Sequence, residues 1–187
     1  MAGYYAGRIR IGEQVFALIV APKTEGEHQD APWNKSSKMV EGATPYFDGL
    51  ANTKAMADAG SNLALWAQGL DIGGNTDWYL PSQDELEIIY RNLKPTTETN
   101  ALRGRSGINL SAVIPTYPYT TDLPTQTQAE AFQQGGEQAF DEAWYWTSTQ
   151  HASHSGCAWG QRFSRGGQGS RRKVNEFRAR AVRRSAI

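Results

Sequence analysis

The chain contains 187 residues, with 19 basic and 19 acidic side chains and a formal net charge of zero at pH 7. This length suffices for one domain with a substantial core, and the balanced charge argues against nucleic acid as the partner. Because Cys157 is the only cysteine, an intrachain disulfide and a cysteine-based zinc cluster are both excluded. No apolar run approaches the ~20 residues of a membrane span, and residues 1–4 lack a signal-peptide pattern. We therefore expect no membrane insertion and synthesis in a reducing cytoplasm.

Two β-strands are predicted at the start of the chain. The runs Tyr4–Ile11 and Gln14–Ala21 are rich in β-formers and meet at Gly12-Glu13, a pattern typical of a hairpin. Within the second run, Val15–Val20 is continuously apolar, which favours a strand buried on both faces. The next region, Pro22–Gly49, is polar and interrupted by glycine and proline, so a long loop is predicted there.

A first helix is predicted to begin at Asn52 or Thr53, either of which can cap it, and to end near Leu70. Gly60 lies inside its apolar stripe and weakens the helix by about 1 kcal/mol. The run Gly73-Gly74 is a strong stop signal after it.

A second helix, after Trp78-Tyr79-Leu80-Pro81, is the clearest local signal in the chain. Ser82 and Glu85 are spaced as a capping box, in which each side chain accepts a hydrogen bond from the other residue's backbone N–H. One apolar face is expected to pack on the core, with residues at helical spacing: Leu86, Ile89, Tyr90 and Leu93. Lys94 and Pro95 end the helix.

The region from Thr96 to residue 140 is rich in Thr, Gln, Pro and Gly. Its prolines exclude a long helix, although a helical turn is predicted around Gln128–Phe132. Loops of this length are usually functional or mobile.

The last third of the chain is again rich in strands, predicted at Ala143–Thr149, Ala158–Phe163 and Phe177–Arg183. Strict alternation in the third run predicts three inward residues, Phe177, Ala179 and Ala181. The arginines of this run are predicted to face solvent: Arg178, Arg180 and Arg183. At least two of the late tryptophans are expected in the core: Trp144, Trp146 and Trp159.

Basic residues are concentrated near the C-terminus. Between Gly160 and Ile187 there are eight arginines and one lysine against a single acid, Glu176, so the rest of the chain is acidic by the same margin. Two interpretations stay open: the two parts neutralise each other on folding, or the basic part forms a functional face.

The order of these motifs resembles the C-type-lectin-like domains of bacterial and phage proteins, including the C-terminal domain of the Legionella collagen-like adhesin. The matching residues are Trp78-Tyr79-Leu80-Pro81-Ser82, Glu85-Leu86, Tyr145-Trp146-Thr147-Ser148-Thr149, Ala158-Trp159, Phe163 and Arg180-Ala181-Val182-Arg183. The same fold occurs in formylglycine-generating enzymes and in receptor-binding proteins diversified by retroelements. The resemblance implies an α+β, C-type-lectin-like fold, with two helices packed on antiparallel sheets with long loops. It covers residues 1–187 as a single domain, with an insertion at 96–140.

An enzymatic function finds weak support in the residues. The formylglycine-generating enzymes use paired cysteines, whereas this chain has Cys157 alone. His151 and His154, beside Ser153 and Ser155, have no local carboxylate to orient either imidazole, so exposed loop histidines are the favoured interpretation.

Metal and phosphate sites are also weakly supported. Asp71, Asn75 and Asp77 do not have the spacing of an EF-hand, so we interpret them as a loop cap. The run Gly166-Gly167-Gln168-Gly169 is glycine-rich but opens no helix, which disfavours phosphate binding. No cofactor, metal site or catalytic residue is therefore predicted.

The resemblance places the late strands and their connections on one exposed face. That face would carry small polar side chains and arginines, which suit recognition of polar ligands: Gln150, His151, Ser153, His154, Arg162, Ser164, Arg165, Gln168, Ser170, Arg171, Arg172 and Asn175.

We therefore expect a non-enzymatic recognition domain. The resemblance implies the receptor-binding tip of a phage or prophage tail fibre, which contacts a host-surface protein or glycan as a homotrimer or attached to a tail-fibre subunit. Its location would be the virion, after synthesis in the bacterial cytoplasm. The first alternative is an adhesin or effector domain at the bacterial surface or secreted. The second is a divergent enzyme of the formylglycine-generating type.

Overall fold

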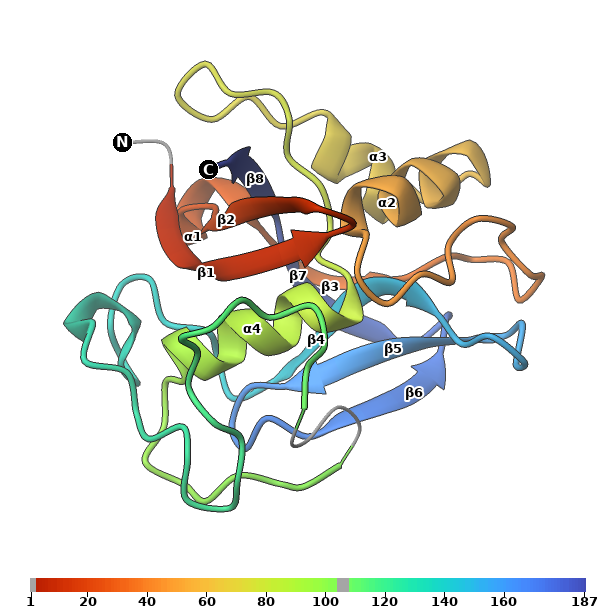
Figure 1. Cartoon of the computed structure of the whole chain (residues 1–187). Coiled ribbons are helices and arrows are strands. Elements are labelled where there is room, and N and C mark those ends of the chain that lie inside the picture. Colours follow the sequence, from red (N-terminus) through yellow and green to blue (C-terminus); the bar gives the residue numbers. More distant parts are fainter. Residues whose placement is uncertain (1–2, 104–107) are drawn as a thin grey trace.

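The computed structural model describes residues 3–103 and 108–187 and combines helices with two sheets (Figure 1). In chain order its elements are β1 (Tyr4–Ile11), β2 (Gln14–Val20), α1 (Lys23–Gly26), β3 (Glu27–Pro32), α2 (Gly49–Asp58), α3 (Asn62–Gln68), α4 (Gln83–Leu93), the 3-10 turn η1 (Glu130–Phe132), β4 (Trp144–Gln150), β5 (Cys157–Arg162), β6 (Gln168–Arg172), β7 (Glu176–Arg180) and β8 (Val182–Ala186). Across the described residues, no helix has the length and apolar character needed to cross a membrane.

The strands form two sheets. The first has three strands in the order β1-β2-β8, and the second has five in the order β3-β7-β4-β5-β6. Neighbouring strands are antiparallel except β4 and β7, which run parallel. Helix α4 lies between the sheets, with the β1–β2 hairpin on one side and β4 and β5 on the other (Figure 1). This arrangement agrees with the α+β, C-type-lectin-like fold expected from the sequence.

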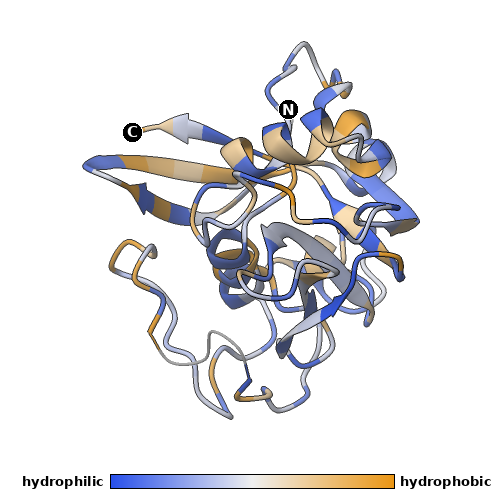
Figure 2. Ribbon diagram, turned by 90° about the vertical axis from the view of Figure 1, so that its right-hand side faces the viewer, coloured by the Kyte–Doolittle hydropathy of each residue, from blue (hydrophilic) through white to orange (hydrophobic). Residues whose placement is uncertain are grey.

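The N-terminal hairpin forms as predicted, and β1 pairs with β2 along its length. Charged and apolar residues alternate along β1, so that Ile9 is buried while Arg10 is exposed (Figure 2). β2 was predicted to be buried on both faces, but Leu18 is buried and its neighbour Ile19 is partly exposed. The main core therefore covers one face of β2 more fully than the other.

The region between Pro22 and Gly49 contains structure that its composition did not indicate. Helix α1 is a single turn, and β3 pairs antiparallel with β7, with His28 opposite Ala179. The partner strand belongs to the far end of the chain. Because strand formation depends on the neighbouring strand more than on local propensity, a short polar strand such as β3 has no local signal.

The helix predicted over residues 52–70 is two helices. α2 begins after Asp48, whose carboxylate accepts a hydrogen bond from the Ala51 N–H at 3.2 Å. α3 begins after Ser61, whose hydroxyl accepts from the Ala64 N–H at 3.4 Å. Gly60 lies between them with φ +78°, a left-handed conformation that ends a helix. The described chain therefore has three helices longer than one turn instead of two.

α4 begins at the predicted capping box. The Ser82 hydroxyl accepts from the Glu85 N–H at 3.3 Å, and the Glu85 carboxylate accepts from the Ser82 N–H at 2.7 Å. The same carboxylate accepts from the Gly49 N–H at 3.1 Å and from the Tyr79 hydroxyl at 2.7 Å. Tyr79 in turn forms a β-bridge with Val182 of β8. The capping box thus joins the starts of two helices to the smaller sheet.

α4 is buried on nearly all sides, not on one face as predicted. Its apolar side packs between the sheets, and the 96–140 segment covers its polar side. The Asp84 carboxylate accepts from the Ser111 hydroxyl at 2.6 Å, and the Glu87 carboxylate accepts from the Asn109 amide. Charged residues can be buried here because the covering loop supplies hydrogen-bond partners.

Aromatic rings fill the core between α4 and the larger sheet. Phe163 stacks on Phe140 with ring centroids 4.0 Å apart, and it meets Tyr145 and Tyr90 edge to face. These geometries are the favourable ones for aromatic pairs. Phe163, at the end of β5, therefore anchors the strand that carries the candidate site.

Of the three late tryptophans only Trp146 is fully buried, so the expectation of at least two was wrong. The indole N–H of Trp146 donates to the Ala31 carbonyl at 2.9 Å. Trp144 is two residues earlier and therefore on the same face of β4, but it lies nearer the edge of the core and stays partly exposed. Trp159 is also partly exposed.

The strand predicted over residues 177–183 is divided into β7 and β8. Its three arginines were predicted to face solvent, but Arg180 is buried, whereas Arg178 and Arg183 are partly exposed. Arg180 is fully buried, with its guanidinium 2.9 Å from the Glu27 carboxylate. Arg178 lies 3.2 Å from Glu27, and Arg183 lies 2.7 Å from Asp77. Strict alternation was misleading because β3 and the loop before α4 cover the side that the pattern assigned to water.

Burial lowers the pKa of Lys173 to about 8. Its ammonium donates to the Lys38 carbonyl at 2.8 Å and to the Gln150 side chain, and it lies 4.6 Å from the centre of the Trp33 ring. Between pH 8 and 10.5, the unfolded chain keeps a proton that the folded chain has released. Protons therefore favour unfolding in this range, and the contribution of Lys173 to stability increases as pH rises.

We expect the melting temperature of the wild type to rise relative to that of Lys173→Met between pH 8 and 10. Thermal unfolding of both proteins across this range measures the difference, which cancels the titration of other groups. A difference that is constant with pH would show that the Lys173 ammonium has an ordinary pKa.

Candidate functional site

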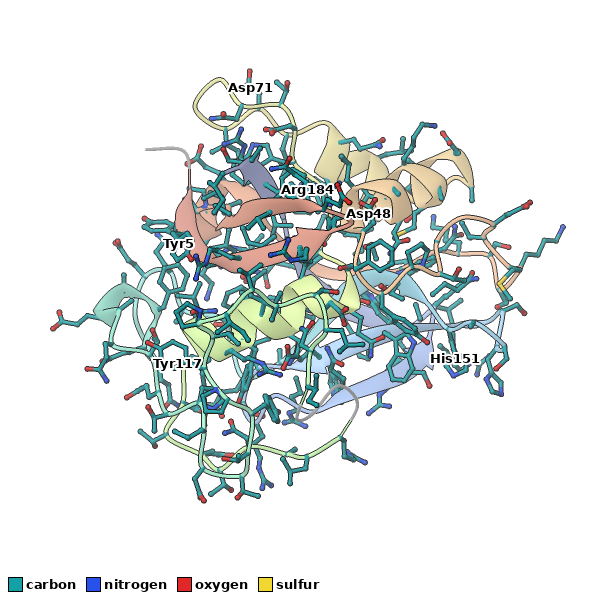
Figure 3. All side chains as sticks on the ribbon, viewed as in Figure 1. Tyr5, Asp48, Asp71, Tyr117, His151 and Arg184 are labelled. Carbon is teal, nitrogen blue, oxygen red and sulfur yellow. The ribbon has the colours of Figure 1, made fainter. Side chains whose placement is uncertain are left out.

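Five arginines of the basic C-terminal part find acidic partners on folding, as one of the two interpretations predicted. The pairs are Arg165–Glu98, Arg178–Glu27, Arg180–Glu27, Arg183–Asp77 and Arg184–Asp48. Figure 3 labels the last pair, which joins β8 to the start of α2. Among residues 3–103 and 108–187, no ion pair neutralises Arg162, Arg171 or Arg172. Of these three, Arg162 and Arg171 line the depression described below, whereas Arg172 lies outside it.

The β5–β6 hairpin holds Arg162 and Arg171 on a rigid support. Its turn closes through the Arg162 N–H, which donates to the Gly167 carbonyl at 3.0 Å, and the Gly166 N–H, which donates to the Arg162 carbonyl at 2.7 Å. Gly166 has φ +73°, and a Cβ there would lie 2.3 Å from the Tyr90 ring. Only glycine allows the turn to pack this closely on α4.

A depression of ≈ 470 Å³ opens beside this hairpin. Residues of β4, β5 and β6 and of the 96–140 segment line it: Glu98, Ala101, Arg103, Glu142, Trp144, Arg162, Ser164, Arg165, Gly167 and Arg171. We call it the arginine pocket. Four arginines and two glutamates give its lining a formal charge of +2, although the whole chain is neutral.

Trp144 and Arg171 form the stacked wall of the arginine pocket. The Arg171 guanidinium lies 4.2 Å from the centre of the Trp144 ring, and its Nη1 donates to the Ser170 carbonyl at 2.9 Å. On the other side, Phe177 stacks on Trp144 at 6.0 Å. A guanidinium held by an indole and a carbonyl has little side-chain entropy left to lose when it binds a ligand.

Arg165 links the pocket to the 96–140 segment. Its guanidinium donates to the Thr99 carbonyl at 3.1 Å and hydroxyl at 3.3 Å, and it lies 3.8 Å from the Glu98 carboxylate. Arg162 donates to the Ser164 hydroxyl at 3.1 Å. Both arginines are therefore positioned before any ligand binds, which lowers the entropy cost of recognition.

Three of the predicted ligand-binding residues are buried. Gln150 accepts from the Val40 N–H at 2.8 Å, and Gln168 donates to the Gln83 carbonyl at 3.0 Å. Ser164 is also buried, but it lines the arginine pocket, and its hydroxyl accepts from Arg162. The strand pattern could not show this, because α4 and the loop before α2 cover that face.

Three further predicted residues lie away from the pocket, at the β4–β5 loop. His151, Ser153 and His154 are at its tip, and Figure 3 shows His151 on the opposite side of the molecule from Tyr117. The Nδ1 atoms of His151 and His154 are 3.1 Å apart, and His151 stacks on Trp159. No group of three metal-ligating side chains occurs among the described residues.

The remaining predictions divide between the pocket and its surroundings. Arg162, Arg165 and Arg171 line the pocket, whereas Ser170, Arg172 and Asn175 do not. The loop-cap interpretation is confirmed for Asp71 but not for Asp77. The Asp71 carboxylate accepts from the Gly74 N–H at 3.0 Å, and Asp77 pairs with Arg183.

Six lining residues escaped the sequence-based prediction: Ala101 and Gly167, and four with larger side chains, Glu98, Arg103, Glu142 and Trp144. Of these four, the first two belong to the 96–140 segment, which the chain folds back against the hairpin. The Ala101 N–H donates to the Arg165 carbonyl at 2.8 Å, and this hydrogen bond joins the segment to the hairpin. For Glu98 and Arg103, the only available signal in the sequence was the unusually long polar loop.

The fold is that of a C-type-lectin-like domain, and the arginine pocket is its most basic depression among those described. A family model described as the Lcl C-terminal domain matches residues 25–183, most of the chain. The chain therefore belongs to the Lcl C-terminal domain family, which confirms the resemblance to the Legionella collagen-like adhesin. Its class is an adhesin-like recognition domain. Comparison with curated proteins and with solved structures gave no match.

Proposed function

We propose that this chain is a non-enzymatic recognition domain that binds an acidic glycan of a cell surface in the arginine pocket. The observation that carries the proposal is the set of arginines that converge on one depression in a chain with no net charge. Guanidinium groups bind carboxylate and sulfate groups through paired hydrogen bonds. A concave, polar pocket suits a sugar unit better than the flatter interface of a folded protein partner.

The positions of perturbed titratable groups support a non-catalytic role. Burial raises the pKa values of Glu85 and Glu87 and lowers the pKa of Lys173. All three are core residues with structural hydrogen bonds, and none lines the arginine pocket. An acid or base catalyst would be expected in the pocket itself.

The test compares binding to arrays of carboxylated, sulfated and neutral glycans. We expect the acidic glycans to bind, and the affinity to fall at least about 100-fold in the double variant Arg162→Gln/Arg171→Gln. Each charged hydrogen bond contributes about 1.5–3 kcal/mol, and 1.4 kcal/mol corresponds to a factor of ten. Calorimetry on the best array ligand measures the change.

Arg172→Gln is the matched control, because Arg172 is exposed on β6 but lies outside the pocket. It is expected to keep wild-type affinity. Binding that prefers neutral glycans, or that survives the double variant, would contradict the proposal. Binding of acidic peptides in place of glycans would assign the pocket to a protein ligand.

The biological setting is part of the proposal. The sequence resemblance favours the tip of a phage or prophage tail fibre, and membership of an adhesin family supports an equivalent role at a bacterial surface. Strain-dependent binding to whole bacterial cells favours the phage setting, whereas binding to host tissue glycans favours the adhesin. Assembly into a homotrimer would add avidity to weak single sites, and a strict monomer at micromolar concentration would contradict that assembly.

A further inference from the structure

A second depression, of ≈ 370 Å³, adjoins the arginine pocket. It is lined almost wholly by the 96–140 segment: Lys94, Thr97, Glu98, Thr99, Thr121, Asp122, Thr125, Gln126 and Gln128. We call it the threonine pocket. Glu98 lines both depressions, so that its side chain stands at their common border.

The walls of the threonine pocket are fixed to the core. Lys94, at the end of α4, donates to the Pro124 carbonyl at 3.1 Å and to the Glu98 carbonyl. The Asn100 amide donates to the Pro124 carbonyl at 3.1 Å and accepts from the Tyr90 hydroxyl at 2.7 Å. Although the segment has little regular secondary structure, these buried contacts hold it as part of the scaffold.

The arginine and threonine pockets also share a structural link. Arg165 lines the arginine pocket, and its guanidinium binds both the carbonyl and the hydroxyl of Thr99, which lines the threonine pocket. A ligand that contacts Arg165 is therefore next to the entrance of the second pocket. The two depressions form neighbouring parts of one surface.

The two pockets differ in charge. The threonine pocket has Lys94 against Glu98 and Asp122, a formal charge of −1, whereas the arginine pocket has +2. Its other lining groups are four threonine hydroxyls and two glutamine amides. Hydroxyls and amides each offer a donor and an acceptor, which are the partners that sugar hydroxyls need. A second acidic group would be repelled there.

We infer that the two pockets form one directional site for an acidic oligosaccharide. An acid-bearing sugar occupies the arginine pocket, and the adjoining uncharged, hydroxyl-rich sugar occupies the threonine pocket. This inference rests on the proposed function and adds the length, order and charge pattern of the ligand. It assigns the 96–140 segment the role of selecting the sugar unit that is attached to the acidic one.

The test uses three probes that differ in their second unit: sialic acid alone, sialyllactose, in which neutral sugars are attached to the acid, and disialic acid, in which the second unit is also an acid. We expect sialyllactose to bind about tenfold more tightly than sialic acid, as two added neutral hydrogen bonds would give. Disialic acid should bind no more tightly than sialic acid. Calorimetry on the full chain measures all three.

The double variant Thr97→Val/Thr125→Val removes two exposed hydroxyls from the threonine pocket without changing its shape. It is expected to abolish the gain of sialyllactose while keeping the affinity for sialic acid. Thr116→Val, in the same segment but outside both pockets, is the matched control. Arg162→Gln/Arg171→Gln should weaken all three probes.

The outcomes separate this inference from the proposed function. An unchanged gain in the valine variant, an equal gain for disialic acid, or no gain at all overturns the directional site. If the arginine variant still loses binding in those cases, the proposed recognition of an acidic group is supported and the directional site is not. Failure of every probe to bind the wild type counts against both.

Discussion

Replacing Glu27 with alanine is expected to lower the free energy of unfolding by about 3–5 kcal/mol, as removal of one partner of a buried ion pair typically does. Glu27 is the counter-ion of Arg180, at 2.9 Å, and of Arg178, at 3.2 Å, and it accepts from the Tyr145 hydroxyl at 3.2 Å. The Arg180 side chain is completely shielded from water. Without Glu27 its charge would have no opposite charge in contact with it.

Chemical denaturation of Glu27→Ala and the wild type measures this loss, which corresponds to a decrease in melting temperature of about 10 °C. The double variant Glu27→Met/Arg180→Met should be more stable than Glu27→Ala, because it leaves no unpaired charge in the core. Asp58→Ala breaks the exposed Lys54–Asp58 pair and is the control, with an expected change below about 1 kcal/mol. A loss from Glu27→Ala as small as this would show that water reaches Arg180.

Replacing Glu85 with alanine is expected to destabilise the fold by about 4 kcal/mol. The Glu85 carboxylate accepts three buried hydrogen bonds, from Ser82, Gly49 and Tyr79, and it lies 3.8 Å from Arg184. Each buried donor left without an acceptor costs about 1–3 kcal/mol. The effect exceeds the ~1 kcal/mol of an ordinary helix cap because the carboxylate also joins α4 to α2 and to Tyr79.

Glu85→Gln is the matched variant, since it retains the shape of the side chain and one acceptor oxygen. It should lose less than half as much stability as Glu85→Ala, measured by the same denaturation. If the two variants are equally stable, the carboxylate acts only through its charge. If Ser82→Ala costs as much as Glu85→Ala, the links to Gly49 and Tyr79 contribute nothing.

Local sequence patterns predicted several elements whose contacts are close in the chain, although β6, which pairs with β5 across a short turn, was missed. The β1–β2 hairpin needs only a turn at Gly12 between two runs of β-formers, and the capping box needs only Ser82 and Glu85 three residues apart. β4 and β5 were found in the same way. β3 was missed, and α2 and α3 were merged, because a partner strand and a left-handed Gly60 determine them.

The candidate site was predicted in part. The resemblance assigned Arg162, Arg165 and Arg171 to the exposed face, and these three line the arginine pocket, but it could not tell which side of a strand another part of the chain would cover. Gln150 and Gln168 were therefore assigned to the surface although they are hydrogen-bonded in the core. At least two of Trp144, Trp146 and Trp159 were expected in the core, but only Trp146 is fully buried, and Trp144 lines the pocket.

The sequence by itself determined the family, the hairpin, the capped helix and the basic character of the late strands, because each depends on residue types at short, regular spacing. Only the tertiary structure decided that Glu27 neutralises Arg180 and that the 96–140 segment covers α4. It also brought Glu98 beside Arg165. These contacts join residues far apart in the chain, and their charges are buried together only when the sheets and α4 have packed. No local sequence pattern can predict such a distant partner.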